Sequence, residues 1–200
     1  MNNKIDPNLI EMRDLSEQDI PLILNYWYHS PQGFFESMGV DLTKMLTESE
    51  MEKKLREKLS ENKTLQGSKL NVVIILYNKE AIGNHTINPL VEGDHGIFHA
   101  HIWKMGMRGK GLGVYTYPKA CKIFMQRFNL KKILFKTPIQ NISAIRVKEK
   151  LGIRFVGEEI IDFGIVRAGT RAKVFELTKE EVDKKWEQKT LNTTPLQKPN

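Results

Sequence analysis

The chain has a single cysteine and no long hydrophobic run. Cys121 has no second thiol with which to form an intramolecular disulfide, and one cysteine excludes a multi-cysteine zinc site. The longest apolar stretch, residues 72–77, is far too short to span a bilayer. Residues 1–7 lack the apolar segment of a secretory signal. We therefore expect a cytoplasmic protein that has no membrane partner.

The composition is also not that of a disordered or fibrous chain. The 200 residues are 40% hydrophobic and 28% charged, which is typical of one large globular domain. The 31 basic and 24 acidic residues give a net charge of +7, which fits either an anionic partner or a well-solvated surface. The lysine-rich stretches hold one aromatic residue, Trp186, so nucleic acid is not an expected partner.

Hydrophobic periodicity and turn residues predict elements in the order β-α-α-β-β-β-α-β-α-β-β. This order predicts an α/β (mixed α+β) fold with a central mixed sheet of six to seven strands and helices on both faces. Residues 1–10 are expected to be an extension, 11–188 one domain, and 189–200 a disordered polar tail. Pro118 is expected to kink or restart its helix. The expected strands span residues 11–15, 71–77, 81–90, 97–104, 132–136, 154–166 and 171–177, and the helices follow Ser16 and Gly113 or span 47–61 and 141–151.

The strongest local signal is the segment RGKGLG, residues 108–113, between an expected strand and an expected helix. Glycines let the backbone approach a ligand closely, and a helix N-terminus offers unpaired N–H groups at its positive end. This pattern indicates a cradle for an anion such as a diphosphate. The P-loop sequence is absent, and the dinucleotide fingerprint fails at Val114 and Thr116. A plain strand-to-helix turn is the alternative.

Two ordered motifs resemble the GNAT superfamily of N-acetyltransferases. The residues Arg108-x-x-Gly111-x-Gly113 match that family's acetyl-CoA motif, [QR]-x-x-G-x-[GA]. Residues 141–152, NISAIRVKEKLG, are similar to its N-x-x-[SA]-x-R-V-x-E-K-L-G segment, most closely in the Rim-type ribosomal-protein acetyltransferases. The similarity covers about residues 11–177. It implies a GNAT-like fold in which one strand splays from its neighbour at the cofactor cleft.

The resemblance further implies an enzyme that transfers acetyl from acetyl-CoA to a primary amine by direct attack on the thioester, without a metal. The strand before the loop would bond the pantetheine arm, and the loop amides would hold the diphosphate. Arg108 and Lys110 would neutralise phosphate charge, and Asn141 would orient the thioester region. The implied acetyl-CoA-binding residues are His101, Ile102, Trp103, Arg108, Gly109, Lys110, Gly111, Leu112, Gly113, Val114 and Asn141.

Two positions depart from the family pattern. Lys148 replaces the tyrosine that often acts as general acid, and Lys136 replaces a glutamate that can act as base in Rim-type relatives. His99, on the strand beside the implied thioester, is the candidate base, and a half-buried structural histidine is the alternative. Tyr115 is the candidate acid; Tyr117 lies near it on the same helix, and helix packing is the alternative role for both.

The acceptor site is expected in the aromatic-rich loop that contains Phe34, Phe35 and Glu36, although these residues also suit core packing and a solvated surface. His85 and His95 lie nearer turns and are expected at the surface. Peptide N-termini, polyamines, antibiotics and small amino-acid-like amines all remain open as acceptors. The alternative functions are a non-catalytic acyl-CoA-binding or sensing module and a ribosome-associated N-terminal acetyltransferase. The protein is expected to be a monomer or a homodimer.

Overall fold

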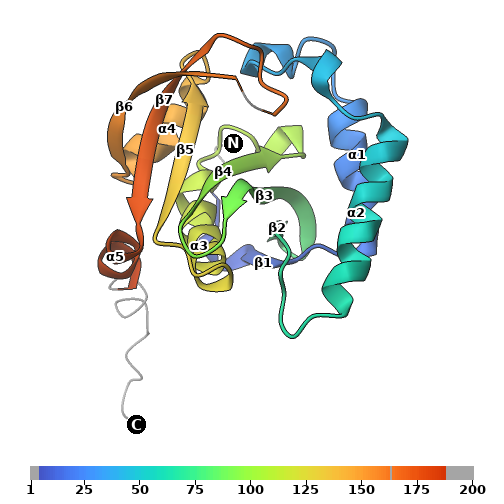
Figure 1. The fold of residues 1–200 in the computed structure, drawn as a ribbon, viewed down its shortest axis with the longest axis horizontal. Coiled ribbons are helices and arrows are strands. Elements are labelled where there is room, and N and C mark those ends of the chain that lie inside the picture. Colours follow the sequence, from blue (N-terminus) through green and yellow to red (C-terminus); the bar gives the residue numbers. More distant parts are fainter. Residues whose placement is uncertain (1–4, 163, 188–200) are drawn as a thin grey trace.

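A seven-stranded mixed sheet organises the part of the chain that the computed structural model describes, residues 5–162 and 164–187 (Figure 1). The strands are β1 (Ile10–Asp14), β2 (Val72–Tyr77), β3 (Glu80–Val91), β4 (His95–Ile102), β5 (Lys132–Pro138), β6 (Arg154–Ile161) and β7 (Thr170–Thr178). Their order in the sheet is β1-β2-β3-β4-β5-β7-β6. The predicted mixed sheet of six to seven strands is therefore confirmed.

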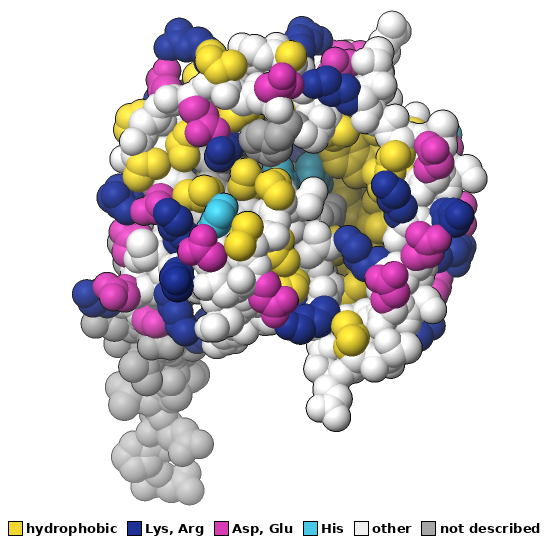
Figure 2. Space-filling model, viewed as in Figure 1, with side chains coloured by type: hydrophobic (Ala, Val, Ile, Leu, Met, Phe, Trp, Pro, Cys, Tyr) yellow, Lys and Arg dark blue, Asp and Glu magenta, His cyan; other side chains and the backbone are white. Residues whose placement is uncertain are grey.

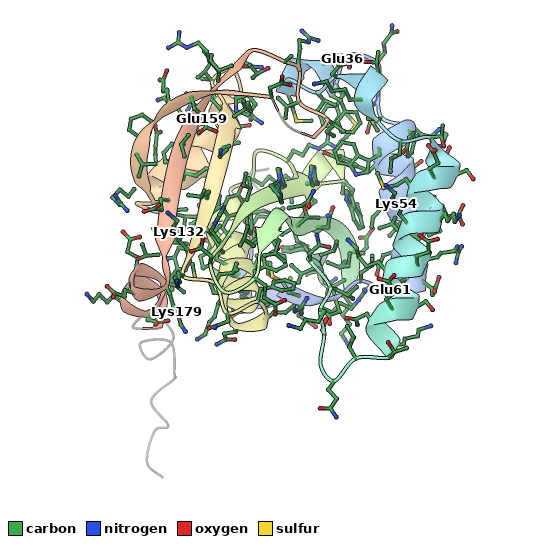
Figure 3. All side chains as sticks on the ribbon, in the orientation of Figure 1. Glu36, Lys54, Glu61, Lys132, Glu159 and Lys179 are labelled. Carbon is green, nitrogen blue, oxygen red and sulfur yellow. The ribbon has the colours of Figure 1, made fainter. Side chains whose placement is uncertain are left out.

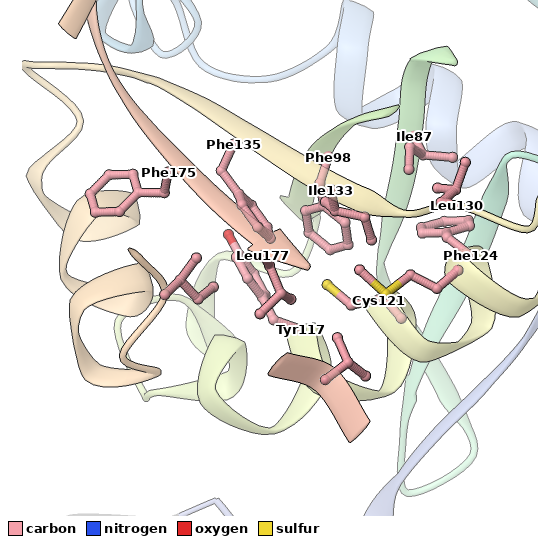
Figure 4. Close-up of a cluster of buried hydrophobic side chains, with 14 of the residues drawn as sticks. Ile87, Phe98, Tyr117, Cys121, Phe124, Leu130, Ile133, Phe135, Phe175 and Leu177 are labelled. Atoms are coloured by element: carbon pink, nitrogen blue, oxygen red, sulfur yellow. The ribbon is translucent and has the colours of Figure 1, made fainter. Parts of the chain in front are cut away.

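Helices cover both faces of this sheet, as the sequence predicts. On one face, Leu55 and Leu59 pack with Ile74 in a core that the first two helices share. On the other face, Tyr117 and Phe124 pack against Phe98 and Phe135 (Figure 4). The helices are α1 (Ile20–Tyr28), α2 (Glu48–Lys63), α3 (Leu112–Arg127), α4 (Ile142–Lys150) and the single turn α5 (Lys179–Val182), which a π-helical turn (Asp183–Glu187) follows.

Capping residues explain where α1 and α2 begin, and α3 continues through a proline that is predicted from the sequence to interrupt it. Thr47 and Glu50 form a capping box at the start of α2, in which the Glu50 carboxylate accepts from the Thr47 amide at 2.8 Å. Ser16 and Asp19 form a second capping box, at the short 3₁₀ turn that leads into α1. The expected restart at Pro118 is not observed, because α3 runs through it as one 16-residue helix.

The strands β4 and β5 diverge, as predicted for the cofactor cleft. They are parallel neighbours but pair only from His95 opposite Lys132 to Ile97 opposite Leu134. Beyond this point β4 stays with β3, whereas β5 pairs along its whole length with β7. Residues 98–102 therefore have no partner strand on the β5 side, and the sheet opens there.

The predicted domain limits, residues 11 and 188, lie near the two ends of the described residues. Ile5 is buried against Ile10, the first residue of β1, so part of segment 1–10 packs on the domain. The predicted disordered tail, residues 189–200, lies outside the described residues. Domain 11–188 remains a prediction.

Candidate active site

A cleft of about 690 Å³ lies between the opened sheet and the helices α1 and α2. Figure 2 shows this hollow beside α2, with hydrophobic side chains on its walls and histidine at its depth. The walls include Trp27 from α1, Leu55 from α2 and His99 from β4. Asn141 and Lys148 line the same cleft, so the second motif, residues 141–152, contributes to its wall.

The glycine-rich loop leads into the N-terminus of α3, where successive backbone amides have no protein acceptor among the described residues. Gly109 and Gly111 have φ of +72° and +81°, and a Cβ atom at either position would meet no other atom within 4 Å. Among the described residues, the five consecutive amides from Gly109 to Gly113 donate to no protein acceptor, and Val114 bonds to the Gly111 carbonyl at 3.1 Å. Five unpaired N–H groups at a helix start offer charge-assisted bonds to a phosphate.

Gly113 has a different role from Gly111. A Cβ atom at Gly113 would lie 2.8 Å from a methyl group of Val147 on α4. Gly113 therefore allows α3 and α4 to pack closely, whereas Gly111 supplies the left-handed backbone that ends the loop.

The two cations of the loop lie in different surroundings. Arg108 donates to the carbonyl oxygens of Ile102 and Trp103 at 2.8 and 3.2 Å, and its guanidinium stacks over the Phe34 ring at 4.2 Å. It thus holds the end of β4 in place. The side chain of Lys110 is exposed at the mouth of the amide cradle. Of these two side chains, Arg108 is engaged in contacts with the protein, whereas Lys110 is exposed to solvent.

The segment of residues 101–103 is fixed on its inner side. The Trp103 amide donates to the Ile82 carbonyl at 2.8 Å, and its indole N–H donates to Asn84 at 2.9 Å. The His101 ring packs on Trp27 at 4.9 Å, and burial lowers the pKa of His101 to about 3. His101 is therefore neutral and a weak base throughout the neutral pH range.

His99 retains a nitrogen that can accept a proton. Its Nε2 lies 2.6 Å from the carbonyl oxygen of Asn88, and since a carbonyl only accepts, Nε2 carries the hydrogen. The lone pair of the neutral ring is then on Nδ1. Burial lowers the pKa of His99 below its usual value, and the bond to Asn88 opposes this shift. The ring is thus deprotonated near neutrality, as a base requires.

Asn141 and Tyr117 line the cleft, whereas Tyr115 does not. The Asn141 side-chain oxygen caps α4 by accepting from the Ala144 amide at 3.2 Å, and its residue lines the cleft. Tyr115 packs in the cluster of Ile102 and Leu112 and is not among the cleft residues. Tyr117 lines the cleft, and burial raises its pKa far above the usual value.

Lys148, which in the sequence is only a departure from the family's tyrosine, is a buried residue of the cleft wall. Its side chain is 5% exposed, and Nζ lies 5.5 Å from the centre of the Tyr117 ring. Burial lowers the pKa of Lys148 to about 7. Helical spacing was the available signal, because position 148 is two turns after Asn141 on one face of α4.

The aromatic loop contributes one of its three candidates to the cleft. Phe35 is buried, stacks on Trp27 at 4.8 Å and lines the cleft. Phe34 covers Arg108 instead. Glu36, labelled in Figure 3, lies on a short 3₁₀ turn at the outer rim and is not a lining residue.

The expectation of a surface position is wrong for His85. Its side chain is fully buried between Phe98 and Tyr117, and neither ring nitrogen has a hydrogen-bond partner among the described residues. Position 85 lies in the middle of β3 and faces α3, so the sheet and helix enclose it. Burial lowers the pKa of His85 to about 3.

The described residues contain neither a metal-binding cluster nor a membrane-spanning helix. No group of three or more His, Cys, Asp or Glu side chains there is arranged to hold a metal ion. No helix in the same residues is long and apolar enough to cross a bilayer.

Comparison with known proteins assigns the family. Residues 10–154 match the acetyltransferase (GNAT) domain. The chain belongs to the GNAT acetyltransferase family. This GNAT chain is therefore an acyltransferase by family, and its predicted fold is confirmed. No curated protein matches it.

Solved structures share this GNAT fold at low sequence identity. Spermidine N-acetyltransferase from Vibrio cholerae, in complex with CoA and spermine, has a TM-score of 0.67 at 16% identity and covers 88% of this chain and 98% of its own. RimL, a ribosomal α-N-protein acetyltransferase in complex with CoA, has a TM-score of 0.67 at 10% identity and covers 86% of this chain and 96% of its own. The microcin self-immunity acetyltransferase MccE, in complex with acetyl-CoA and AMP, has a TM-score of 0.65 at 9% identity and covers 86% of this chain and 93% of its own. The expected likeness to Rim-type enzymes is confirmed.

Proposed function

We propose that this GNAT chain transfers the acetyl group of acetyl-CoA to a primary amine by direct attack on the thioester. The observation that carries the proposal is the run of five unpaired amides from Gly109 to Gly113 at the start of α3. It suits the diphosphate of CoA, and it lies where β4 and β5 separate and leave room for an extended arm. Structural neighbours that hold CoA or acetyl-CoA support the same donor.

In this proposal acetyl-CoA supplies an activated acyl group, and the protein supplies position and proton transfer. The amine nitrogen bonds to the carbonyl carbon, the carbon–sulfur bond breaks, and CoA leaves as a thiolate. His99 accepts the proton that the amine loses, through Nδ1. Lys148, buried beside Tyr117, supplies positive charge to the thiolate. Proximity in the cleft accounts for much of the expected rate.

Calorimetry tests the donor. Acetyl-CoA should bind at least about a hundredfold more tightly than S-acetylpantetheine, which has the same thioester but no diphosphate. Three or four charge-assisted bonds at roughly 1.5–3 kcal/mol each can provide this difference. Equal affinities would contradict the assignment of the diphosphate to the loop of residues 109–113.

Release of free CoA thiol tests the reaction. A panel of peptides with free N-termini, amino acids, polyamines and aromatic amines should include acceptors that release thiol in step with acetylated product. Tight binding of acetyl-CoA without release for any amine favours the alternative function, a non-catalytic acyl-CoA-binding or sensing module.

A further inference from the structure

The lining of the cleft holds lysines but no acidic side chain among the residues that the structure describes. Four lysines from four different segments line it, whereas no aspartate or glutamate does so among the described residues. A site for a second ammonium group would need carboxylates, because like charges at close range disfavour binding. The four lysines are Lys44, Lys58, Lys136 and Lys148.

Two of these lysines are already paired with acids outside the cleft. Lys44 donates to Asp162 at 3.2 Å and to the Val166 carbonyl at 3.1 Å. Lys136 forms an ion pair with Glu159 at 2.6 Å. Their charge is therefore largely satisfied within the protein.

Lys58 and Lys148 form no ion pair with a carboxylate in the part of the chain that is described. Lys148 lies deep, with its ammonium over Tyr117 and Phe135. Lys58 stands on the opposite wall, on α2, and donates only to the side-chain oxygen of Asn71 at 2.6 Å. Burial lowers the pKa of Lys58, and the charge of Glu61, one turn later on α2, opposes that shift without forming an ion pair. An anion beside Lys58 would relieve that cost.

The wall near Lys58 is hydrophobic and aromatic. Leu55 and Met51 precede it on the same helix and line the cleft, as do Trp27 and Phe35, whose rings stack on each other. An acceptor that fits this wall has an apolar or aromatic body between its amine and its charge.

We infer that the acceptor is an amine that also carries an anionic group, a carboxylate or a phosphate, which Lys58 binds against the apolar wall of α2. This inference rests on the proposed function, because it specifies the acceptor of the same reaction. It sets the chain apart from its structural neighbour that binds spermine, a molecule with several ammonium groups.

Four matched benzylamines test the inference. They differ only in the group opposite the aminomethyl: a carboxylate in 4-(aminomethyl)benzoate, a phosphonate in 4-(aminomethyl)phenylphosphonate, an uncharged methyl in 4-methylbenzylamine (the neutral amine) and a second ammonium in 1,4-bis(aminomethyl)benzene (the diamine). The better anion should exceed the neutral amine in kcat/KM at least tenfold, and the diamine should be the poorest. The two anions together distinguish carboxylate from phosphate recognition.

Substitutions in α2 test whether Lys58 is the residue that causes the preference for anionic acceptors. Lys58→Met should remove at least tenfold from the kcat/KM of the preferred anion and change the neutral amine less than threefold. Lys58→Glu should make the diamine the best of the four. Lys53→Met deletes the same charge on the exposed side of the same helix and should change none of the preferences.

Binding of the four amines to the protein–CoA complex, measured by calorimetry, separates the two proposals. Anion-selective binding that Lys58→Met abolishes, without turnover, supports the anion site beside Lys58 and contradicts the proposed reaction. Turnover in which the neutral amine or the diamine equals the anions overturns the inference and leaves the reaction standing. Binding of none of the four amines overturns the inference as well.

Discussion

At the scale of the residue, Lys148 is an ammonium group buried against aromatic rings with no carboxylate partner in the described residues. Its pKa is lowered from 10.5 to about 7 by burial. Between these values the unfolded chain holds a proton that the folded protein lacks, so the free energy of unfolding rises with pH across this window. Below about pH 7 the full cost of burying the charge is present.

Lys148→Met should therefore raise the free energy of unfolding at pH 7 by at least about 1 kcal/mol and flatten its rise between pH 7 and 10. Because we assign Lys148 to the departing thiolate, kcat/KM should fall at least tenfold in the same variant, about 1.4 kcal/mol of transition-state stabilisation. Denaturant titrations and steady-state rates measure the two effects. A variant that gains stability and keeps full activity would show that Lys148 has no part in the reaction.

His99 carries the second prediction at this scale. His99→Gln should lower kcat/KM by about 10²–10⁴-fold, because glutamine keeps a donor for Asn88 but has no basic nitrogen. As the pH falls through the lowered pKa of His99, the ring gains a proton and activity is lost, so the acidic limb of wild type lies below 6.5.

The glutamine variant should lack that limb. If it stays within about threefold of wild type across roughly pH 5–8, His99 is a structural histidine. An acceptor with a low pKa, such as a peptide α-amine, would then fit better, because removing its proton at pH 7 costs only about 1 kcal/mol.

At the scale of the element, Gly111 and Gly113 belong to one sequence motif but have different roles at the start of α3. Gly111→Ala places a methyl group at a left-handed position beside the unpaired amides, where it contacts no protein atom. Acetyl-CoA affinity should fall at least tenfold, about 1.4 kcal/mol, with a stability loss of roughly 1–2 kcal/mol. Calorimetry and thermal unfolding measure the two.

Gly113→Ala should instead act on the contact between α3 and α4. Its new methyl group would lie 2.8 Å from Val147, so overpacking should cost about 1–3 kcal/mol of stability. Adding Val147→Ala should recover most of that loss, whereas it should not restore acetyl-CoA binding in Gly111→Ala. Additive losses in the double variant would contradict the assigned contact.

This contrast shows why sequence pattern predicts elements better than roles. The run of glycines identified the loop, but spacing alone gave Gly111 and Gly113 the same function. Likewise Tyr115 and Tyr117 are two residues apart, so they face different sides of α3, and only the position of the sheet decides that Tyr117 meets the cleft.

At the scale of the whole molecule, alternating and β-branched patterns predicted the mixed sheet because they reflect local burial, whereas the splayed strand was implied only by the resemblance to the GNAT family. The cleft itself combines α1, α2, β4 and α4 with loops far apart in sequence. The charge balance of the cleft could not be predicted, because it depends on the ion pairs that Lys44 and Lys136 form with acidic residues distant in sequence. The burial of His85 depends in the same way on α3 packing over β3.

Burial of neutral histidines gives the molecule a sensitivity to acid. His85 and His101 have pKa values of about 3, whereas each is near 6.5 in the unfolded chain. From pH 6.5 down to about 3 the unfolded chain binds protons that the folded protein does not, so the free energy of unfolding decreases as the pH falls. Each histidine can contribute up to about 1.4 kcal/mol per pH unit in that window and nothing above it.

His85→Leu isolates one of these contributions, because the ring makes no hydrogen bond that leucine would lose. The variant should match or exceed wild type in stability at pH 7, and the difference should grow as the pH falls toward 4. Urea titrations at pH 7, 6, 5 and 4 measure it, and His29→Leu controls for adding a leucine at an exposed position. Parallel curves for wild type and His85→Leu would mean that the histidine takes up its proton in the folded state. Protonation of the ring would then have to be accommodated between Phe98 and Tyr117, the two aromatic side chains that pack against it.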